Sequence, residues 1–398
     1  MHSIDERLER IERHAHLGAF WRLEVQPPTV DGPLSGRLVA FKDSFAVAGT
    51  ERDSGVPFLL ERSEADAPVV RAHRAAGATI VGKLAMHQLA WGMMGQTPGR
   101  PAVRNPHDPS RIPGGSSSGS AVALAAGLVD LAPGTDTGGS VRAPASACGI
   151  VGLKPTFGLV DLRGIHVNVR TLDCCGPMAR TVADCALGLD VLVGRQPRPV
   201  EPARLAGLRV GVLEEWFCVG LDAGVERAFR HTLDVLGRAG AVLAPADIGW
   251  QHDHAVLRDL FACEPVPHYA DGVRADPDSY EPFIVADLAD GEVTPLRQYL
   301  ASLARLDAVR ERALIDADDW DVLACPTLPL PPPPIDGPDL TLTLNRNTKA
   351  FNGLGWPAIS IPCGTDDLGL PVGLQLIARP HRDDYLLAVA AAVEGALA

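Results

Sequence analysis

Short apolar runs alternate with helical patterns along this chain, and this alternation constrains its fold more than any other feature. The run 37–41 (RLVAF) predicts a buried strand, 68–77 predicts a helix ended by Gly77, and 78–82 (ATIVG) predicts a second buried strand. Strand, helix and strand in this order are typical of an α/β sheet. Further segments extend the pattern, with strands at 209–213, 358–362 and 370–376, and helices at 4–14, 121–128, 181–193, 223–239 and 385–397. We therefore expect an α/β protein.

Glycine, proline and serine gather in stretches without helical or strand periodicity. Residues 96–120 predict a long loop, 133–146 have no regular period, 195–202 predict a hinge or linker, and 326–338 predict a rigid extended loop with seven prolines. Long loops inside a compact domain are usually functional, so the candidate chemistry is sought there. The region 250–300 is less informative. Its His252 and His254 favour a solvated or capping pair over a metal site.

Composition excludes several classes of protein. The net charge is −13, and no run of Lys and Arg offers a nucleic-acid surface. The N-terminus lacks the apolar core of a signal peptide, and no apolar run approaches the roughly 18 residues of a membrane span. The eight cysteines are scattered, which favours reduced thiols over a disulfide framework. We expect a cytoplasmic protein that binds neither nucleic acid nor membrane.

One glycine-rich segment, 134–142 (GTDTGGSVR), offers a nucleophile. Ser140 follows two glycines, so few side chains crowd its approach. Successive backbone amides in such a turn form an anion-binding concavity and can stabilise an oxyanion. The candidate donors are the amides of Thr137, Gly138, Gly139 and Ser140. Asp136 and Arg142 flank the turn, and their pairing would hold its shape.

A nucleophilic serine needs a base, because its hydroxyl is hardly ionised near neutral pH. No histidine lies in a recognisable triad motif, and the GxSxG match around Ser117 lacks the strand that precedes a nucleophile elbow. A lysine can act as the base if burial makes it neutral. Lys42 ends an apolar strand, and a hydroxyl of Ser116, in the segment 114–120 (GGSSSGS), would bridge it to Ser140. These residues predict a Ser-Ser-Lys proton relay.

Taken singly, each of these features has a plainer interpretation. A GGSSSGS segment is more often a flexible or phosphate-binding loop, and a lysine at a strand end is usually a surface residue. No GxxxxGK[ST] loop supports ATP binding. The joint arrangement favours catalysis over these alternatives.

Together these segments resemble the amidase-signature family. The similarity is carried by 114–120, 134–142 and 149–156 (GIVGLKPT), with further matches at 82–89, 104–106, 172–173, 176–178 and 353–376. Ser140 follows Ser116 by 24 positions, the spacing that this family keeps between its bridging and nucleophilic serines. The resemblance spans most of residues 32–195 and 320–395.

The resemblance implies the fold and a role for each residue. It implies a single large domain over 1–398, with a central twisted mixed β-sheet covered by helices on both faces, a helical segment at 1–31 and a variable substrate-side region at 200–320. It makes Ser140 the nucleophile, Ser116 the bridging serine after a cis Gly115–Ser116 bond, Lys42 the base and Ser117 a supporting hydrogen-bond partner. It also places Trp91, Met93, Met94 and Gly115 at the substrate pocket, although the first three would serve equally as core residues.

The resemblance has departures, which leave the substrate open. Many relatives read GKTNMxE where this chain has GKLAMHQ at 82–88, and Lys42 comes early in the chain. The expected function is hydrolysis of a small carboxamide through an acyl-enzyme, without metal or organic cofactor; homodimers are common among relatives. One alternative is a glutamine-hydrolysing amidotransferase subunit that passes ammonia to a partner protein, which the short 200–320 span weakens. Another, of a different class, is a non-catalytic binding protein on the same scaffold.

Overall fold

The largest sheet has seven strands in the order β11-β10-β12-β14-β13-β7-β9. The computed structural model describes residues 4–398; residues 1–3 of the predicted N-terminal segment lie outside them. The strands of this sheet are β7 (Val151–Lys154), β9 (Met178–Ala179), β10 (Arg209–Leu213), β11 (Val242–Ala246), β12 (Val322–Pro326), β13 (Ala358–Thr365) and β14 (Pro371–Ile377). Strand β10 is parallel to β11 and β12, and the other neighbours are antiparallel. The predicted mixed sheet is confirmed.

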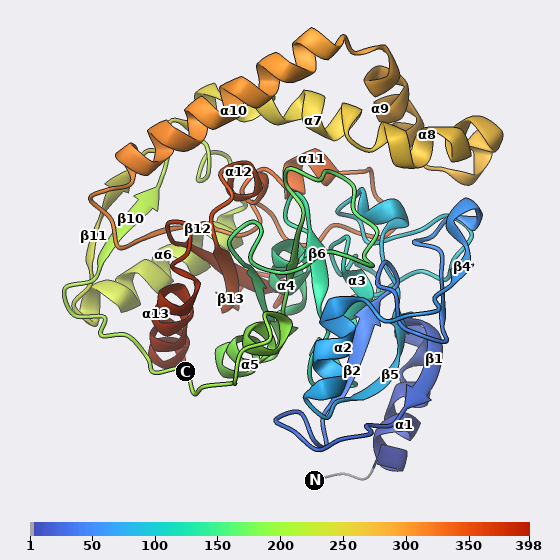
Figure 1. The fold of residues 1–398 in the computed structure, drawn as a ribbon. Helices are drawn as coiled ribbons and strands as arrows, with labels where there is room; N and C mark the ends of the chain where they lie inside the picture. Colours follow the sequence, from blue (N-terminus) through green and yellow to red (C-terminus); the bar gives the residue numbers. More distant parts are fainter. Residues whose placement is uncertain (1–3) are drawn as a thin grey trace.

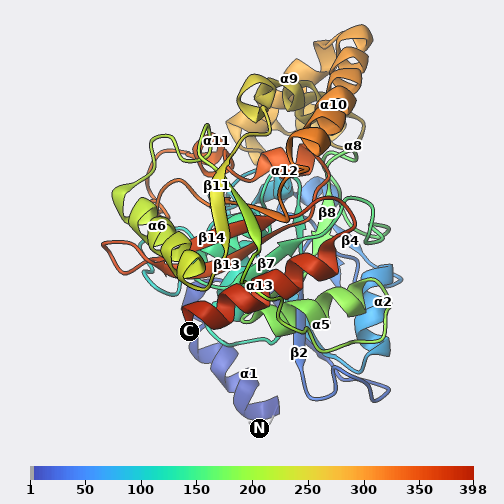
Figure 2. The same cartoon turned by 90° about the vertical axis from the view of Figure 1, so that its left-hand side faces the viewer.

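Both faces of this sheet are covered, as the alternation of side chains in β12 shows. Val322 and Ala324 pack into a core shared with α5 (Val182–Leu192), α6 (Ala223–Arg238) and α13 (Asp383–Leu397). Leu323 and Cys325 pack into a second core with Trp250 and Leu306. Successive side chains of a strand point to opposite faces, so these two cores lie on opposite sides of the sheet. Figure 2 shows α5 (Val182–Leu192) and α13 (Asp383–Leu397) lying across one face.

A second sheet of three strands, β1-β5-β2, holds the N-terminal part of the chain. Strands β2 (Leu38–Lys42) and β5 (Thr79–Leu84) are parallel and joined through helix α2 (Pro68–Ala75), which confirms the predicted strand–helix–strand unit. Strand β1 (Phe20–Gln26) adds to β5 in antiparallel pairing. The segment 1–31 is therefore only partly helical, with α1 (Ile4–Arg13) followed by a strand that apolar periodicity did not reveal.

A two-stranded ribbon connects the two sheets. It consists of β6 (Gly134–Asp136) and β8 (Cys174–Gly176). The Ala40 amide donates to the Leu131 carbonyl at 3.4 Å on the side of β2, and the Leu153 amide donates to the Pro177 carbonyl at 3.1 Å on the side of β7. Both glycine-rich segments therefore lie near the middle of the molecule (Figure 1).

Two helices begin where the sequence predicted a loop or no regular structure. Helix α3 (Ser118–Ala125) begins three residues earlier than predicted and takes up the end of the serine-rich segment, and α4 (Arg142–Cys148) lies in a stretch predicted to lack regular structure. Both consist mostly of small residues and are buried almost throughout, so they show no amphipathic stripe. None of the helices within residues 4–398 combines the length and apolar content that a membrane span requires.

The region 250–300, whose sequence predicted little about its structure, forms a helical layer at one end of the molecule. Figure 1 shows α7 to α10 along the edge next to α11 and α12, away from α1 and α2. The remaining elements are α6 (Ala223–Arg238), α7 (Arg258–Cys263), α8 (Val266–Ala275), α9 (Pro282–Val293), α10 (Leu296–Asp316), α11 (Thr341–Leu344), α12 (Lys349–Gly353), β3 (Glu51–Arg52) and β4 (Glu61–Arg62).

Candidate active site

Lys42 is the last residue of β2, and its amine is bonded to two hydroxyl groups. Every residue of β2 is buried, which forces the lysine stem through the core. Lys42 Nζ donates to Ser116 Oγ at 2.7 Å and to Thr135 Oγ1 at 2.7 Å. The structure thus brings together two of the three predicted catalytic residues, from segments 74 positions apart.

The surroundings of Lys42 favour its neutral form. Burial lowers the pKa of the Lys42 amine from 10.5 to about 7, although the carboxylates of Asp173 and Asp136 act in the opposite direction. Lys83, the other lysine of this sheet, donates instead to the carbonyls of Asp43 and Phe45, at 2.9 and 2.7 Å. Lys42 is therefore set apart by having hydroxyl groups as its partners, the arrangement that a proton relay needs.

Ser116 precedes helix α3, and the bond before it is the cis peptide Gly115–Ser116 that the resemblance implied. The Ser116 carbonyl accepts from the His87 amide at 3.0 Å. Ser117 ties this segment to the ribbon, because its hydroxyl donates to the Thr135 carbonyl at 3.3 Å and its amide donates to the Ser140 carbonyl at 3.2 Å. These bonds place the 116–117 segment directly beside Ser140.

The turn that carries Ser140 runs between the end of β6 and the start of α4, and a buried ion pair closes it. Arg142 Nη2 lies 2.8 Å from Asp136 Oδ1 and Arg142 Nε lies 3.1 Å from Asp136 Oδ2, with both side chains fully buried. Burial by itself raises the pKa of the Asp136 carboxyl, but the Arg142 guanidinium and the Asn352 amide outweigh it and hold this pKa well below its usual range. The pairing predicted for these residues is present.

The carboxylate of Asp136 also fixes backbone amides of the turn. It accepts from the Gly139 amide at 2.8 Å and from the Val141 amide at 3.0 Å. The first bond engages one of the four amides predicted to hold an oxyanion, so the amides of Thr137, Gly138 and Ser140 are the better candidates. A glycine is required at 139, since its φ is +127° and a Cβ there would lie 2.1 Å from Thr348 Oγ1.

Ser140 lines a small cavity of about 30 Å³. Its other lining residues come from distant parts of the chain: Ala90, Trp91, Gly92, Met93, Thr137, Gly138, Asn168, Phe261, Thr341 and Asn345. Trp91 and Met93, which the resemblance placed at the substrate pocket, are among them. Trp91 Nε1 donates to Asp287 Oδ2 of α9 at 3.2 Å, so the helical layer holds this side chain in place.

Two of the residues predicted for the substrate pocket have other surroundings. Met94 packs in a hydrophobic cluster with Ile112 and Ala143, which corresponds to the core interpretation of this residue. Gly115 lies against the backbone of Gly92, and a Cβ there would meet the Gly92 carbonyl at 2.8 Å. Because Gly115 has no side chain, the segments 92–95 and 114–116 can pack closely against each other.

Several residues of the site were missed by sequence reasoning. Thr135 bonds Lys42 and lies within the 134–142 segment, but no strand was predicted there, so the sequence offered no sign that its hydroxyl would face the lysine. Asp173 accepts from the Asn168 amide at 2.6 Å, and burial raises the pKa of its carboxyl to about 6. Phe261 and Asn345 carry no motif, because only tertiary packing brings them to Ser140.

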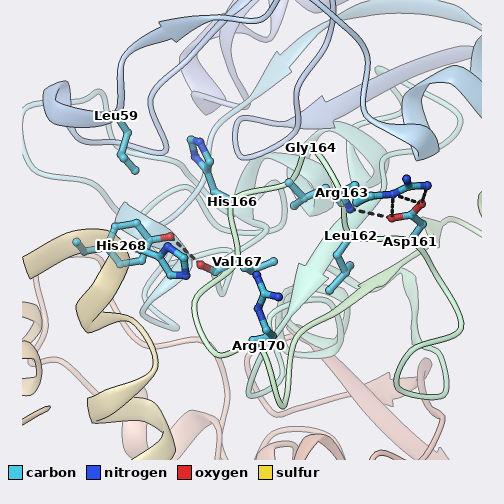
Figure 3. Close-up of a pocket in the computed structure, with 11 residues that line it drawn as sticks. Leu59, Asp161, Leu162, Arg163, Gly164, His166, Val167, Arg170 and His268 are labelled. Atoms are coloured by element: carbon cyan, nitrogen blue, oxygen red, sulfur yellow. Dashed lines mark hydrogen bonds and ion pairs between the residues drawn. The ribbon is translucent and has the colours of Figure 1, made fainter.

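A larger cavity of about 500 Å³ is lined by residues 161–167 together with Leu59, Arg170, His268 and Tyr269 (Figure 3). It lies next to the Ser140 cavity, because the Tyr269 ring is 6.5 Å from the Trp91 ring. The Tyr269 hydroxyl donates to the Val167 carbonyl at 2.9 Å. The segment 161–170 had been given no role at all from the sequence.

Comparison with known proteins agrees with this fold. Residues 22–387 match the family model described as Amidase. The chain is 37% identical over 402 residues to a glutamyl-tRNA(Gln) amidotransferase subunit from Chloroflexus aurantiacus, an alignment covering 90% of this chain and 82% of that one. It is 34% identical over 393 residues to AtzE, a 1-carboxybiuret hydrolase subunit from Pseudomonas sp. strain ADP, covering 92% and 84%.

Among solved structures, a crystal structure of an amidase superposes with a TM-score of 0.91 at 30% identity, covering 99% of this chain and 95% of that one. The sequence, the fold and these relatives define an enzyme, a hydrolase acting on C–N amide bonds. The chain belongs to the amidase family.

Proposed function

We propose that this protein hydrolyses a small carboxamide through an acyl-enzyme on Ser140. The observation that carries the proposal is the bond of 2.7 Å between the buried amine of Lys42 and Ser116 Oγ. An amine whose pKa is about 7 is largely neutral at physiological pH and can accept a proton. The 3.2 Å bond between the Ser117 amide and the Ser140 carbonyl supports a relay that continues to Ser140.

The reaction has two steps. Ser140 Oγ attacks the amide carbon while its proton passes to Ser116 and the proton of Ser116 passes to Lys42. The oxyanion that forms accepts hydrogen bonds from the amides of Thr137, Gly138 and Ser140. Lys42 then returns the proton through Ser116 to the departing nitrogen, which leaves as ammonia or a small amine. Water, deprotonated by the same relay, attacks the ester and releases the acid.

The active site is proposed to exclude bulk water, which would strengthen these interactions. Ser140 is 3% exposed and the cavity beside it holds about 30 Å³. Hydrogen bonds and charges act more strongly where water is excluded. Part of the 200–320 region is proposed to serve the substrate side, with Phe261 of α7 as its contribution to the cavity wall.

Release of ammonia from a panel of small amides tests the proposal. Wild-type protein should release ammonia, and Ser140→Ala should release none above background. Ser120→Ala is a matched control, because Ser120 is equally buried, lies four positions after Ser116, and makes no hydrogen bond through its hydroxyl among the described residues. Equal activity of wild type and Ser140→Ala would refute the proposal.

The relatives favour a second candidate function. Several relatives at 33–37% identity, including those from Chloroflexus aurantiacus and Koribacter versatilis, are subunits of glutamyl-tRNA(Gln) amidotransferase. This chain would then hydrolyse glutamine and pass ammonia to a partner protein. Glutamine hydrolysis by the protein alone does not separate the two functions. A rise in the rate on adding a co-purifying partner would favour the amidotransferase function, and a constant rate would favour the independent hydrolase.

A further inference from the structure

Among the described residues, one guanidinium on the 500 Å³ cavity forms no ion pair. Two arginines line this cavity (Figure 3). Arg163 pairs with Asp161, with 2.5 Å between Nη2 and Oδ2. Within residues 4–398, by contrast, no carboxylate lies within ion-pair distance of Arg170. The rest of the wall combines His166 and His268 with apolar side chains, among them Leu59, Leu162 and Ile165. An exposed arginine on a cavity wall, with no carboxylate at ion-pair distance among the described residues, is the pattern of a site for an anionic group.

The cavity adjoins the site of reaction, because the same two segments line both. In the first segment Asn168 lines the Ser140 cavity and Arg170, two positions later, lines the larger one. In the second segment Phe261 lines the Ser140 cavity and His268 the larger one. The two segments are bonded to each other next to Arg170, since Glu264 accepts from the Thr171 hydroxyl at 2.6 Å.

Among the residues that the structure describes, the other titratable groups of this region form their hydrogen bonds with partners other than Arg170. Glu264 accepts three hydrogen bonds from uncharged donors, which are the Thr171 amide, the Thr171 hydroxyl and the Tyr299 hydroxyl, at 3.0, 2.6 and 3.1 Å. His166 bonds Ser54 Oγ through Nδ1 at 2.7 Å. Figure 3 shows Arg170 and His268 on one side of the cavity and the Asp161–Arg163 pair on the other.

We infer that Arg170 binds a carboxylate at the far end of the acyl chain, so that the substrates are half-amides of dicarboxylic acids. This inference rests on the proposed function, in which the leaving group is ammonia or a small amine and the acyl chain is the part that extends into the larger cavity. A guanidinium holds a carboxylate through two parallel hydrogen bonds, which fixes the position of the chain. The apolar wall then contacts the methylene groups between the two ends.

Binding to a non-hydrolysing variant tests this inference separately from catalysis. Calorimetry with Ser140→Ala protein would compare the half-amides of the dicarboxylic acids from malonic to suberic with the uncharged alkanamides of the same lengths. The best half-amide should bind at least about tenfold more tightly than its uncharged counterpart. Adding Arg170→Gln should weaken the half-amide about ten- to hundredfold and leave the alkanamide unchanged. Adding Arg163→Gln, the matched control on the same cavity, should change neither.

Equal affinity for charged and uncharged amides, no binding by any half-amide, or the same loss from Arg163→Gln as from Arg170→Gln would overturn the inference. Failure of the proposed function has a different signature. In that case wild-type protein would release no ammonia from any amide, whereas the preference of Ser140→Ala protein for half-amides would still be measurable.

Discussion

Replacing Lys42 with methionine should change how the stability of this protein depends on pH. The Lys42 amine has an ordinary pKa of 10.5 that burial lowers to about 7. A shift of this size corresponds to about 5 kcal/mol between the charged and neutral forms. Methionine has a similar shape and no titratable group, so the Lys42→Met variant lacks this contribution at every pH.

The sign of the effect follows from where the proton is bound. Below about pH 7 the amine is protonated in both the folded and the unfolded chain, so the full cost of the buried charge lowers stability. Between about pH 7 and 10 the unfolded chain holds a proton that the folded protein has lost, so stability rises by about 1.4 kcal/mol per pH unit. Because the amine is half protonated at its pKa, the full slope is reached only above pH 7, and the wild type should gain about 2 kcal/mol relative to Lys42→Met between pH 7 and pH 9.

Urea unfolding of both proteins at pH 7, 8 and 9 measures this difference. The methionine variant also loses the bonds to Ser116 and Thr135, and this loss shifts the two stability curves apart without changing their relative slope. Measurements begin at pH 7 because Asp173, whose pKa burial raises to about 6, titrates below it. A difference between the two proteins that stays constant over this range would refute the claim that Lys42 is neutral in the folded state.

Two further predictions concern the turn that carries Ser140. Arg142→Met would leave the Asp136 carboxylate buried without its cation. We therefore expect the free energy of unfolding, measured by urea titration at pH 7, to fall by about 3–5 kcal/mol. A loss below about 1 kcal/mol would contradict the structure. Gly139→Ala would place a Cβ 2.1 Å from Thr348 Oγ1, at a φ of +127°. Because the turn must then shift, the rate of amide hydrolysis should fall at least about a hundredfold and the melting temperature should also fall. Wild-type activity of this variant would disprove the steric requirement.

The sequence predicted those parts of the fold that have a simple period. The buried strands β2 and β5 and the amphipathic helix α6 were placed within a few residues of their observed bounds. Helix α3 was placed three residues too late and α4 was missed, because mostly small, buried residues leave no amphipathic stripe to detect. The helical layer α7–α10 was missed because its contacts, such as that of Asp287 with Trp91, join residues far apart in the chain.

The candidate site likewise has one part that the sequence predicted and another that only the structure shows. Lys42, Ser116 and Ser140 could be named because they lie in dense glycine-rich or strand-end motifs, and the structure bonds the first two directly. The sequence could not show which of the four expected amides are free to bind an oxyanion. The structure separates them, because the Gly139 amide donates to the Asp136 carboxylate. Phe261 and Arg170 could not have been found, because the positions of cavity walls depend on how distant segments pack.

The central claim is that Lys42 activates Ser140 through Ser116, and the rate at which a fluorophosphonate labels Ser140 tests it most directly. In wild-type protein this rate should rise with pH through about 7, as the Lys42 amine loses its proton. In Lys42→Ala protein it should be at least about a hundredfold slower and show no bend near pH 7. Labelling of Lys42→Ala at the wild-type rate, with the same bend, would contradict the account.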